Sequence, residues 1–120
     1  MKILSTDIFM FKIPMTPFTI ATGTMEYAQN IVIKIHTDEG IIGWGECSAF
    51  PMIVGETQLS CYQIAKDFAS FWKGKNPLAI SERLQELDSI IAGNYTAKSA
   101  FDLALYDIAA KAANQPLYAF

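Results

Sequence analysis

The pattern of apolar residues changes once along these 120 residues, close to residue 55. Before that point β-branched and aromatic residues are frequent, and isoleucines recur at every second position of residues 31–35, which is typical of strands with one buried face. After it apolar residues recur every three or four positions, which is typical of amphipathic helices. The chain is therefore expected to fold as one α+β domain, in which a three-stranded antiparallel β-meander is followed by a helical bundle.

The first half predicts strands over residues 2–13, 29–37 and 41–48. The first of them is rich in β-branched and aromatic residues and is followed by Pro14, which is expected to close it. A short "DEG" segment separates the second and third strands, and its Gly40 can adopt the left-handed conformation of a hairpin loop. These two strands are therefore expected to pair as an antiparallel hairpin.

Two sets of residues predict which faces of these strands are buried. Ile31, Ile33 and Ile35 alternate with less apolar residues and are expected on one face. Gly43 and Gly45 share one face of the third strand. Because glycine has no side chain, that face is expected to let another backbone approach closely.

The second half predicts three helices, over residues 57–72, 77–92 and 96–113. Thr57 can cap the first, and an Asn-Pro pair is expected to open the second. Gly93 supplies a left-handed stop after the second helix. The third is rich in alanine, with its larger apolar residues at helical spacing.

The composition excludes several classes of function. The net charge of -3 and pI near 5.0 disfavour nucleic acid, whose phosphates require clustered lysine and arginine. No apolar run approaches the roughly 18–20 residues that span a bilayer. Asp7 and Lys12 interrupt the stretch that a signal peptide would need, so a cytoplasmic protein is expected. Cys47 and Cys61 are too few for a disulfide framework or a four-ligand zinc site, and both are expected to be reduced.

Five polar residues are candidates for chemistry, and each has a structural explanation. Glu46 ends a strand but has no partner of matched role nearby, and Cys47 has no histidine near it in sequence. His36 lies beside a hairpin loop without a cluster of ligands at metal-binding spacing. Asp102 and Asp107 lie about 140° apart around a helix, so they cannot jointly bind one ion. The residues taken alone therefore predict no catalytic or metal-binding site.

Three segments together nevertheless resemble a known family. They are "GIIGWGEC" at 40–47, "GET" at 55–57 and "AKSAFDLALYDIAAKAANQPLY" at 97–118. This combination is similar to the N-terminal capping domain of the enolase superfamily, within its muconate-lactonizing branch and closest to the dipeptide epimerases. The resemblance covers essentially all of residues 1–120. It implies a TIM-type barrel after this domain, so the chain is expected to be truncated before the barrel.

The resemblance implies a chemistry that the domain itself does not supply. In the family, two barrel lysines remove the α-proton of the substrate and return it to the opposite face, and Mg²⁺ held by barrel carboxylates stabilises the enediolate. The parent protein is therefore expected to be an Mg²⁺-dependent isomerase of dipeptides and a homo-oligomer. No catalytic or metal residue is assigned within residues 1–120, which are expected to be inactive without their own C-terminal barrel.

The resemblance assigns substrate specificity to this domain. Residues 14–25 and 47–56 correspond to two loops that close over the barrel and contact the distal part of the substrate. Gly23 aligns with an arginine of the epimerases that prefer glutamate, and residues 14–25 contain no lysine or arginine. Because burying a carboxylate without a cation is costly, hydrophobic Ala-Xaa-type dipeptides are the expected substrates. The residues expected to bind them are Phe18, Thr19, Gly23, Thr24 and Ile53.

Two other interpretations stay open. The first, which ranks second to the dipeptide epimerase, is that the domain caps a muconate cycloisomerase or an o-succinylbenzoate synthase, since the caps of these enzymes share the same strands and helices. In a different class, the chain would be a non-catalytic α+β binding module, which predicts that residues 1–120 fold cooperatively and stay monodisperse alone. A cap without its barrel is instead expected to expose an apolar face, in line with the 52% of hydrophobic residues.

Overall fold

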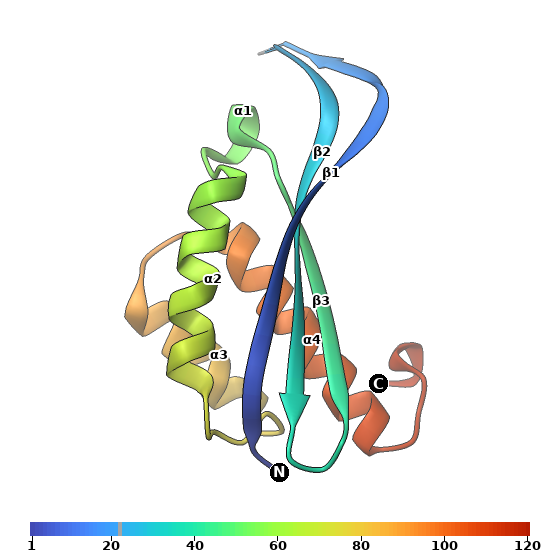
Figure 1. Ribbon diagram of the computed structural model, residues 1–120, viewed down its shortest axis with the longest axis vertical. Helices are drawn as coiled ribbons and strands as arrows, with labels where there is room; N and C mark the ends of the chain where they lie inside the picture. Colours follow the sequence, from blue (N-terminus) through green and yellow to red (C-terminus); the bar gives the residue numbers. More distant parts are fainter. Residues whose placement is uncertain (22) are drawn as a thin grey trace.

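The computed structural model describes residues 1–21 and 23–120 and shows three strands followed by helices (Figure 1). The sheet is antiparallel, with the strand order β1-β2-β3. The predicted α+β class is confirmed. The elements are β1 (Ile3–Ile20), β2 (Gly23–Thr37), β3 (Ile42–Ala49), α1 (Pro51–Val54), α2 (Gln58–Trp72), α3 (Ile80–Ile90), α4 (Tyr95–Ala112) and the 3-10 helix η1 (Leu117–Ala119).

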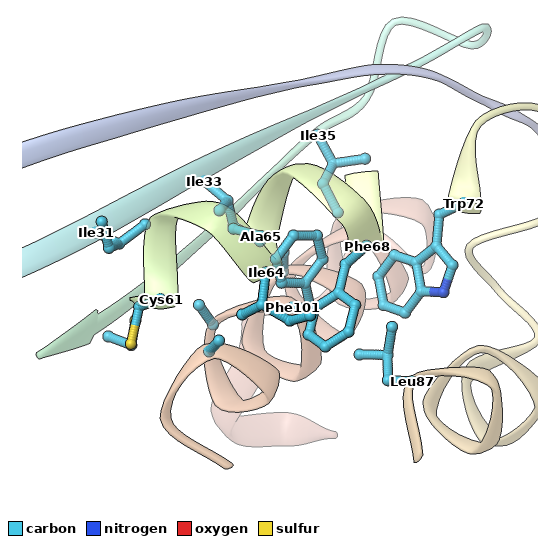
Figure 2. Close-up of a cluster of buried hydrophobic side chains, with 14 of the residues drawn as sticks. Ile31, Ile33, Ile35, Cys61, Ile64, Ala65, Phe68, Trp72, Leu87 and Phe101 are labelled. Carbon is cyan, nitrogen blue, oxygen red and sulfur yellow. The ribbon is translucent and has the colours of Figure 1, made fainter. Parts of the chain in front are cut away.

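The core lies between one face of the sheet and the helices (Figure 2). The three alternating isoleucines of β2 are all buried, as the period of two predicts. Three aromatic rings fill the centre: Phe68 and Trp72 of α2 pack edge-on against Phe101 of α4, with centroid distances of 5.4 and 5.3 Å. Edge-to-face pairs of this kind add to the stabilisation that comes from burying the rings.

The backbone of α4 lies directly on β3. A Cβ atom on Gly45 would overlap the carbonyl oxygen of Ala100 and would lie 3.2 Å from the amide nitrogen of Ala104. A Cβ atom on Gly43 would lie 2.6 Å from the carbonyl oxygen of Ala104. The two glycines and the small residues of α4 therefore allow the close backbone approach that the sequence predicts.

The β1–β2 hairpin is longer than predicted and projects past the helices (Figure 1). Pro14 does not close the first strand: it pairs with Tyr27, and after a register shift the strand continues to Ile20. A proline removes one hydrogen bond from the ladder, which an edge strand tolerates, and β1 is at the edge of this sheet. The predicted ranges 2–13 and 29–37 are therefore too short at the hairpin tip.

The second predicted helix, 77–92, is also wrong at its start, because α3 begins at Ile80. Asn76 accepts a hydrogen bond from the amide of Leu78 at 2.9 Å, so it caps a local turn and not the helix. The cap of the first predicted helix agrees with the sequence: Thr57 forms a reciprocal capping box at the start of α2.

Candidate functional site

The tip of the β1–β2 hairpin and α1 lie at the same end of the molecule (Figure 1). The ring of Phe18 on β1 packs against that of Phe50, which precedes α1, with centroids 6.3 Å apart and planes inclined by 39°. Gly23 at the start of β2 lies against Met52 of α1. The two segments to which the resemblance assigns substrate specificity are therefore in contact.

The structure places four of the five predicted substrate-binding residues on the hairpin tip and the fifth on α1. Phe18 is 49% exposed, and Ile53 of α1 is 60% exposed. Thr19 and Thr24 face one another across the hairpin, with their hydroxyl oxygens 3.0 Å apart. Gly23 lies beside this pair, at the start of β2. Two large apolar side chains and two hydroxyl groups are thus available to a molecule that approaches this end.

An apolar hollow of about 310 Å³ lies between the hairpin and the chain that leads into α1. A single serine hydroxyl is the polar side-chain group of its lining, and none of the described lining residues carries a charge. A surface of this kind favours an apolar group, at about 0.8 kcal/mol for each buried CH₂. The lining residues are Met15, Phe18, Met25, Ala28, Ser48 and Phe50.

The sequence identifies Phe18 but not the rest of this lining. Met15 and Met25 lie in a segment that the sequence predicts to be a loop, and the extended pairing of β1 and β2 brings them to the same hollow. Their apolar character is visible in the sequence, but their common face depends on the strand register. Met52, which contacts Gly23, is also missed, because only the fold brings α1 to the hairpin tip.

Two polar side chains anchor the segment that follows α1. Both carboxylate oxygens of Glu56 lie 3.2 Å from the amide nitrogen of Thr96, in the first turn of α4, and accept its hydrogen bond. Gln58 is buried and donates to the carbonyl oxygens of Phe11 (2.8 Å) and Asn30 (3.0 Å). The position of α1 is therefore defined from α4 on one side and from the base of the hairpin on the other.

Replacing Glu56 by alanine is expected to destabilise the protein by about 1–2 kcal/mol. Asn94, the N-cap of α4, makes no capping side-chain bond among the described residues, so Glu56 supplies the acceptor and the negative charge that this helix start favours. Hydrogen exchange at the Thr96 amide should be faster in Glu56→Ala than in wild type. Glu56→Gln should show a smaller effect, and Glu26→Ala on the exposed hairpin is the matched control. Unchanged exchange at Thr96 in Glu56→Ala would contradict the anchor.

Two of the other polar candidates, Glu46 and Asp107, make structural contacts. Glu46 accepts a hydrogen bond from the Asn30 side chain at 2.6 Å. Asp107 accepts one from the backbone amide of Trp44 and another from Lys111, each at 2.8 Å, and so joins α4 to β3. Within residues 1–21 and 23–120, no group of three or more His, Cys, Asp or Glu residues is arranged to hold a metal ion.

Both cysteines are free thiols within the core. The neighbouring Cys61 thiol and burial both raise the pKa of the Cys47 thiol far above its usual value. Cys61 donates to Glu56 with a sulfur–oxygen distance of 4.0 Å. A protonated, buried thiol is a poor nucleophile, so Cys47 acts as a small core residue.

A second hollow, of about 520 Å³, lies beside β3 and α4, away from the predicted substrate-binding residues. Trp44, Glu46, Leu103, Asp107 and Leu117 contribute to its lining. Its two acids, Glu46 and Asp107, form the structural hydrogen bonds described above. Among the described residues, no helix has the length and apolarity needed to cross a membrane.

Comparison with known proteins agrees with this architecture. Residues 4–120 match the family described as mandelate racemase / muconate lactonizing enzyme, N-terminal domain. A D-Ala-D/L-Ala epimerase of Cytophaga hutchinsonii is 41% identical over 118 residues, which are 96% of this chain and 32% of that protein. An N-succinyl-L-Arg/Lys racemase of Bacillus cereus is 37% identical over 98% of this chain and 32% of its own length.

A solved structure extends the similarity to three dimensions. The crystal structure of a dipeptide epimerase from Cytophaga hutchinsonii, complexed with Mg and the dipeptide D-Ala-L-Val, superposes with a TM-score of 0.98. It is 39% identical, and the match covers 100% of this chain and 33% of that one. The chain thus spans about a third of the length of the relatives it matches. It belongs to the mandelate racemase / muconate lactonizing enzyme family of the enolase superfamily, as the N-terminal capping domain.

Proposed function

We propose that this domain is the substrate-specificity cap of a longer, Mg²⁺-dependent dipeptide epimerase. The observation that carries the proposal is the uncharged hollow between the hairpin tip and the segment that leads into α1. The reaction class is supported by the D-Ala-D/L-Ala epimerase of Cytophaga hutchinsonii and by the structure of a dipeptide epimerase of the same organism, complexed with Mg and a dipeptide. The epimerisation itself consists of removing the α-proton of one residue and returning it to the opposite face.

The chemistry belongs to residues outside this domain. In this proposal the ion and the proton-transfer groups lie in a C-terminal barrel, since the relatives are about three times as long as this chain. Residues 1–120 contribute binding and exclusion of water at the distal part of the substrate. Cytoplasmic location and assembly into a homo-oligomer stay predictions of the sequence.

Within the cap, we assign contacts by chemical type. Phe18 and Ile53 offer exposed apolar surface to the dipeptide side chain. The hydroxyl groups of Thr19 and Thr24 can donate to or accept from its polar backbone groups, and the backbone of Gly23 lies beside them. The substrate side chain is apolar in this proposal, because an acidic one would enter a lining that supplies no cation.

The full-length enzyme is expected to epimerise Ala-Val or Ala-Phe with at least about tenfold higher kcat/KM than Ala-Glu. A tenfold lower kcat/KM corresponds to a loss of about 1.4 kcal/mol in transition-state binding. Burying the unpaired carboxylate of Ala-Glu costs at least that much. The measurement is α-proton exchange with deuterated solvent for each dipeptide under identical conditions. A higher kcat/KM for Ala-Glu would overturn the apolar assignment.

A charge placed in the cap provides the matched variant. Ile53→Arg should raise the kcat/KM of Ala-Glu relative to Ala-Val, because it adds a cation at an exposed position of α1. Leu59→Arg is the control, since Leu59 is 70% exposed on α2, outside the two segments. An equal shift in both variants would show a general charge effect and would remove Ile53 from the site.

A second candidate activity follows from the racemase relative. The Bacillus cereus protein acts on N-succinyl-Arg/Lys by its name, and its similarity to this chain is close to that of the epimerase. The same exchange assay with N-succinyl amino acids separates the two activities. Muconate lactonisation and o-succinylbenzoate synthesis, the other activities that a cap of this type serves, are tested by including their substrates.

A further inference from the structure

Met52 occupies the space that a side chain on Gly23 would fill. A Cβ atom built on Gly23 would overlap the Met52 sulfur and would lie 3.6 Å from Cε and 3.9 Å from Cγ. Gly23 also has a φ of 155°, which side-chain-bearing residues rarely adopt. The bare backbone at position 23 and the thioether at position 52 therefore form one packed contact between the two segments.

The three apolar side chains of α1 differ in their surroundings. Met52 is half-buried, whereas Ile53 and Val54 are 60% and 50% exposed. Methionine is unbranched and flexible, so it fits an irregular gap against a backbone better than its β-branched neighbours would. Met52 is thus the residue of this helix that packs onto the hairpin.

The anchors at Glu56 and Gln58 hold the chain after α1, whereas the residues of α1 themselves make few other contacts that fix the helix. Its hydrogen bonds are local, from Val54 to the carbonyl of Phe50 and from Gly55 to that of Pro51, both at 3.0 Å. In the described part of the chain, no side chain of α1 is fully buried. A short helix with only local hydrogen bonds opens easily unless packing holds it.

We propose that Met52 is a positioning residue that couples α1 to the hairpin tip, so that the two substrate-facing segments behave as one unit. The kinetic consequence rests on the proposed function. If the substrate side chain binds between these segments, loosening one relative to the other weakens binding at a point remote from the reacting carbon. Such a loss raises KM more than it lowers kcat.

Hydrogen exchange of the full-length protein tests the coupling without reference to activity. Met52→Ala should accelerate exchange in residues 50–55 and also in residues 23–25 of the hairpin. Met52→Leu, which restores most of the volume, should return both segments towards wild type. Val54→Ala is the control on the exposed part of α1. Faster exchange confined to residues 50–55, or equal effects of Met52→Ala and Val54→Ala, would overturn the coupling.

Steady-state kinetics then test the positioning role. In Met52→Ala the KM for Ala-Phe should rise about fivefold while kcat stays within about twofold. In Met52→Leu the KM should return most of the way to the wild-type value. A fall in kcat with unchanged KM would overturn the positioning role. Wild-type protein that is inactive on all dipeptides would refute the proposed function instead, and the exchange experiment would still decide the coupling.

Discussion

Gly45→Ala is expected to destabilise the folded protein by at least about 3 kcal/mol, at the upper end of overpacking effects. The added Cβ atom would overlap the carbonyl oxygen of Ala100 and would lie 2.8 Å from the carbonyl carbon of that residue. It would also contact the amide nitrogen of Ala104. These are backbone atoms of α4, so no side-chain rotation relieves the overlap and the helix must move away from β3. That movement would also lengthen the hydrogen bond that the Trp44 amide donates to the Asp107 carboxylate.

Denaturant unfolding of the full-length protein, followed by tryptophan fluorescence, measures this loss. Gly40→Asn is the matched control: Gly40 has a φ of 78°, which asparagine tolerates, and a Cβ atom there would meet no described atom within 4 Å. The control should change the free energy of unfolding by less than about 1 kcal/mol. A cost below about 1 kcal/mol for Gly45→Ala would mean that β3 and α4 are not in backbone contact.

Phe68→Ala is expected to destabilise the protein by about 3–5 kcal/mol. The Phe68 side chain is fully buried and packs edge-on against Phe101 at the centre of the core (Figure 2). Removing its ring leaves a cavity between α2 and α4 that the surrounding helices cannot fill, and it removes the favourable aromatic contact.

The matched control is the same substitution on the same helix. Phe71 lies on α2 but is 43% exposed, with the ammonium of Lys75 over its ring at 3.7 Å from the centroid. Phe71→Ala should cost about 1 kcal/mol or less. Comparable losses for the two variants, measured by the same unfolding experiment, would contradict the placement of the core between α2, α4 and the sheet.

Much of the fold could be predicted from two patterns: the alternating isoleucines of β2 and the glycines of β3. The buried isoleucines of β2 follow from a local period of two, and the small residues at Gly43 and Gly45 predict a close backbone contact. Pro14 misleads the prediction, because its cost in a strand depends on whether that strand is central or at an edge. Strand order is a property of the whole sheet and is absent from any local window.

The candidate site is predictable only in outline. The two apolar segments and the absence of a cation between residues 14 and 25 are plain in the sequence. The contact of Met52 with Gly23 and the anchoring of Glu56 by the amide of Thr96 join residues far apart along the chain. Such pairs depend on the packing of α1 and α4 around the hairpin, so they could be found only in the structure.

The sequence by itself determined the class of fold, the buried face of β2 and the family, because periodicity and motif spacing are local properties. The tertiary structure decided how far the hairpin extends, which side chains line the hollow, and how α1 is held at its tip. These features depend on strand register and on contacts between segments that are distant in the sequence. Such contacts form, and contribute to stability, only when the sheet and helices pack together.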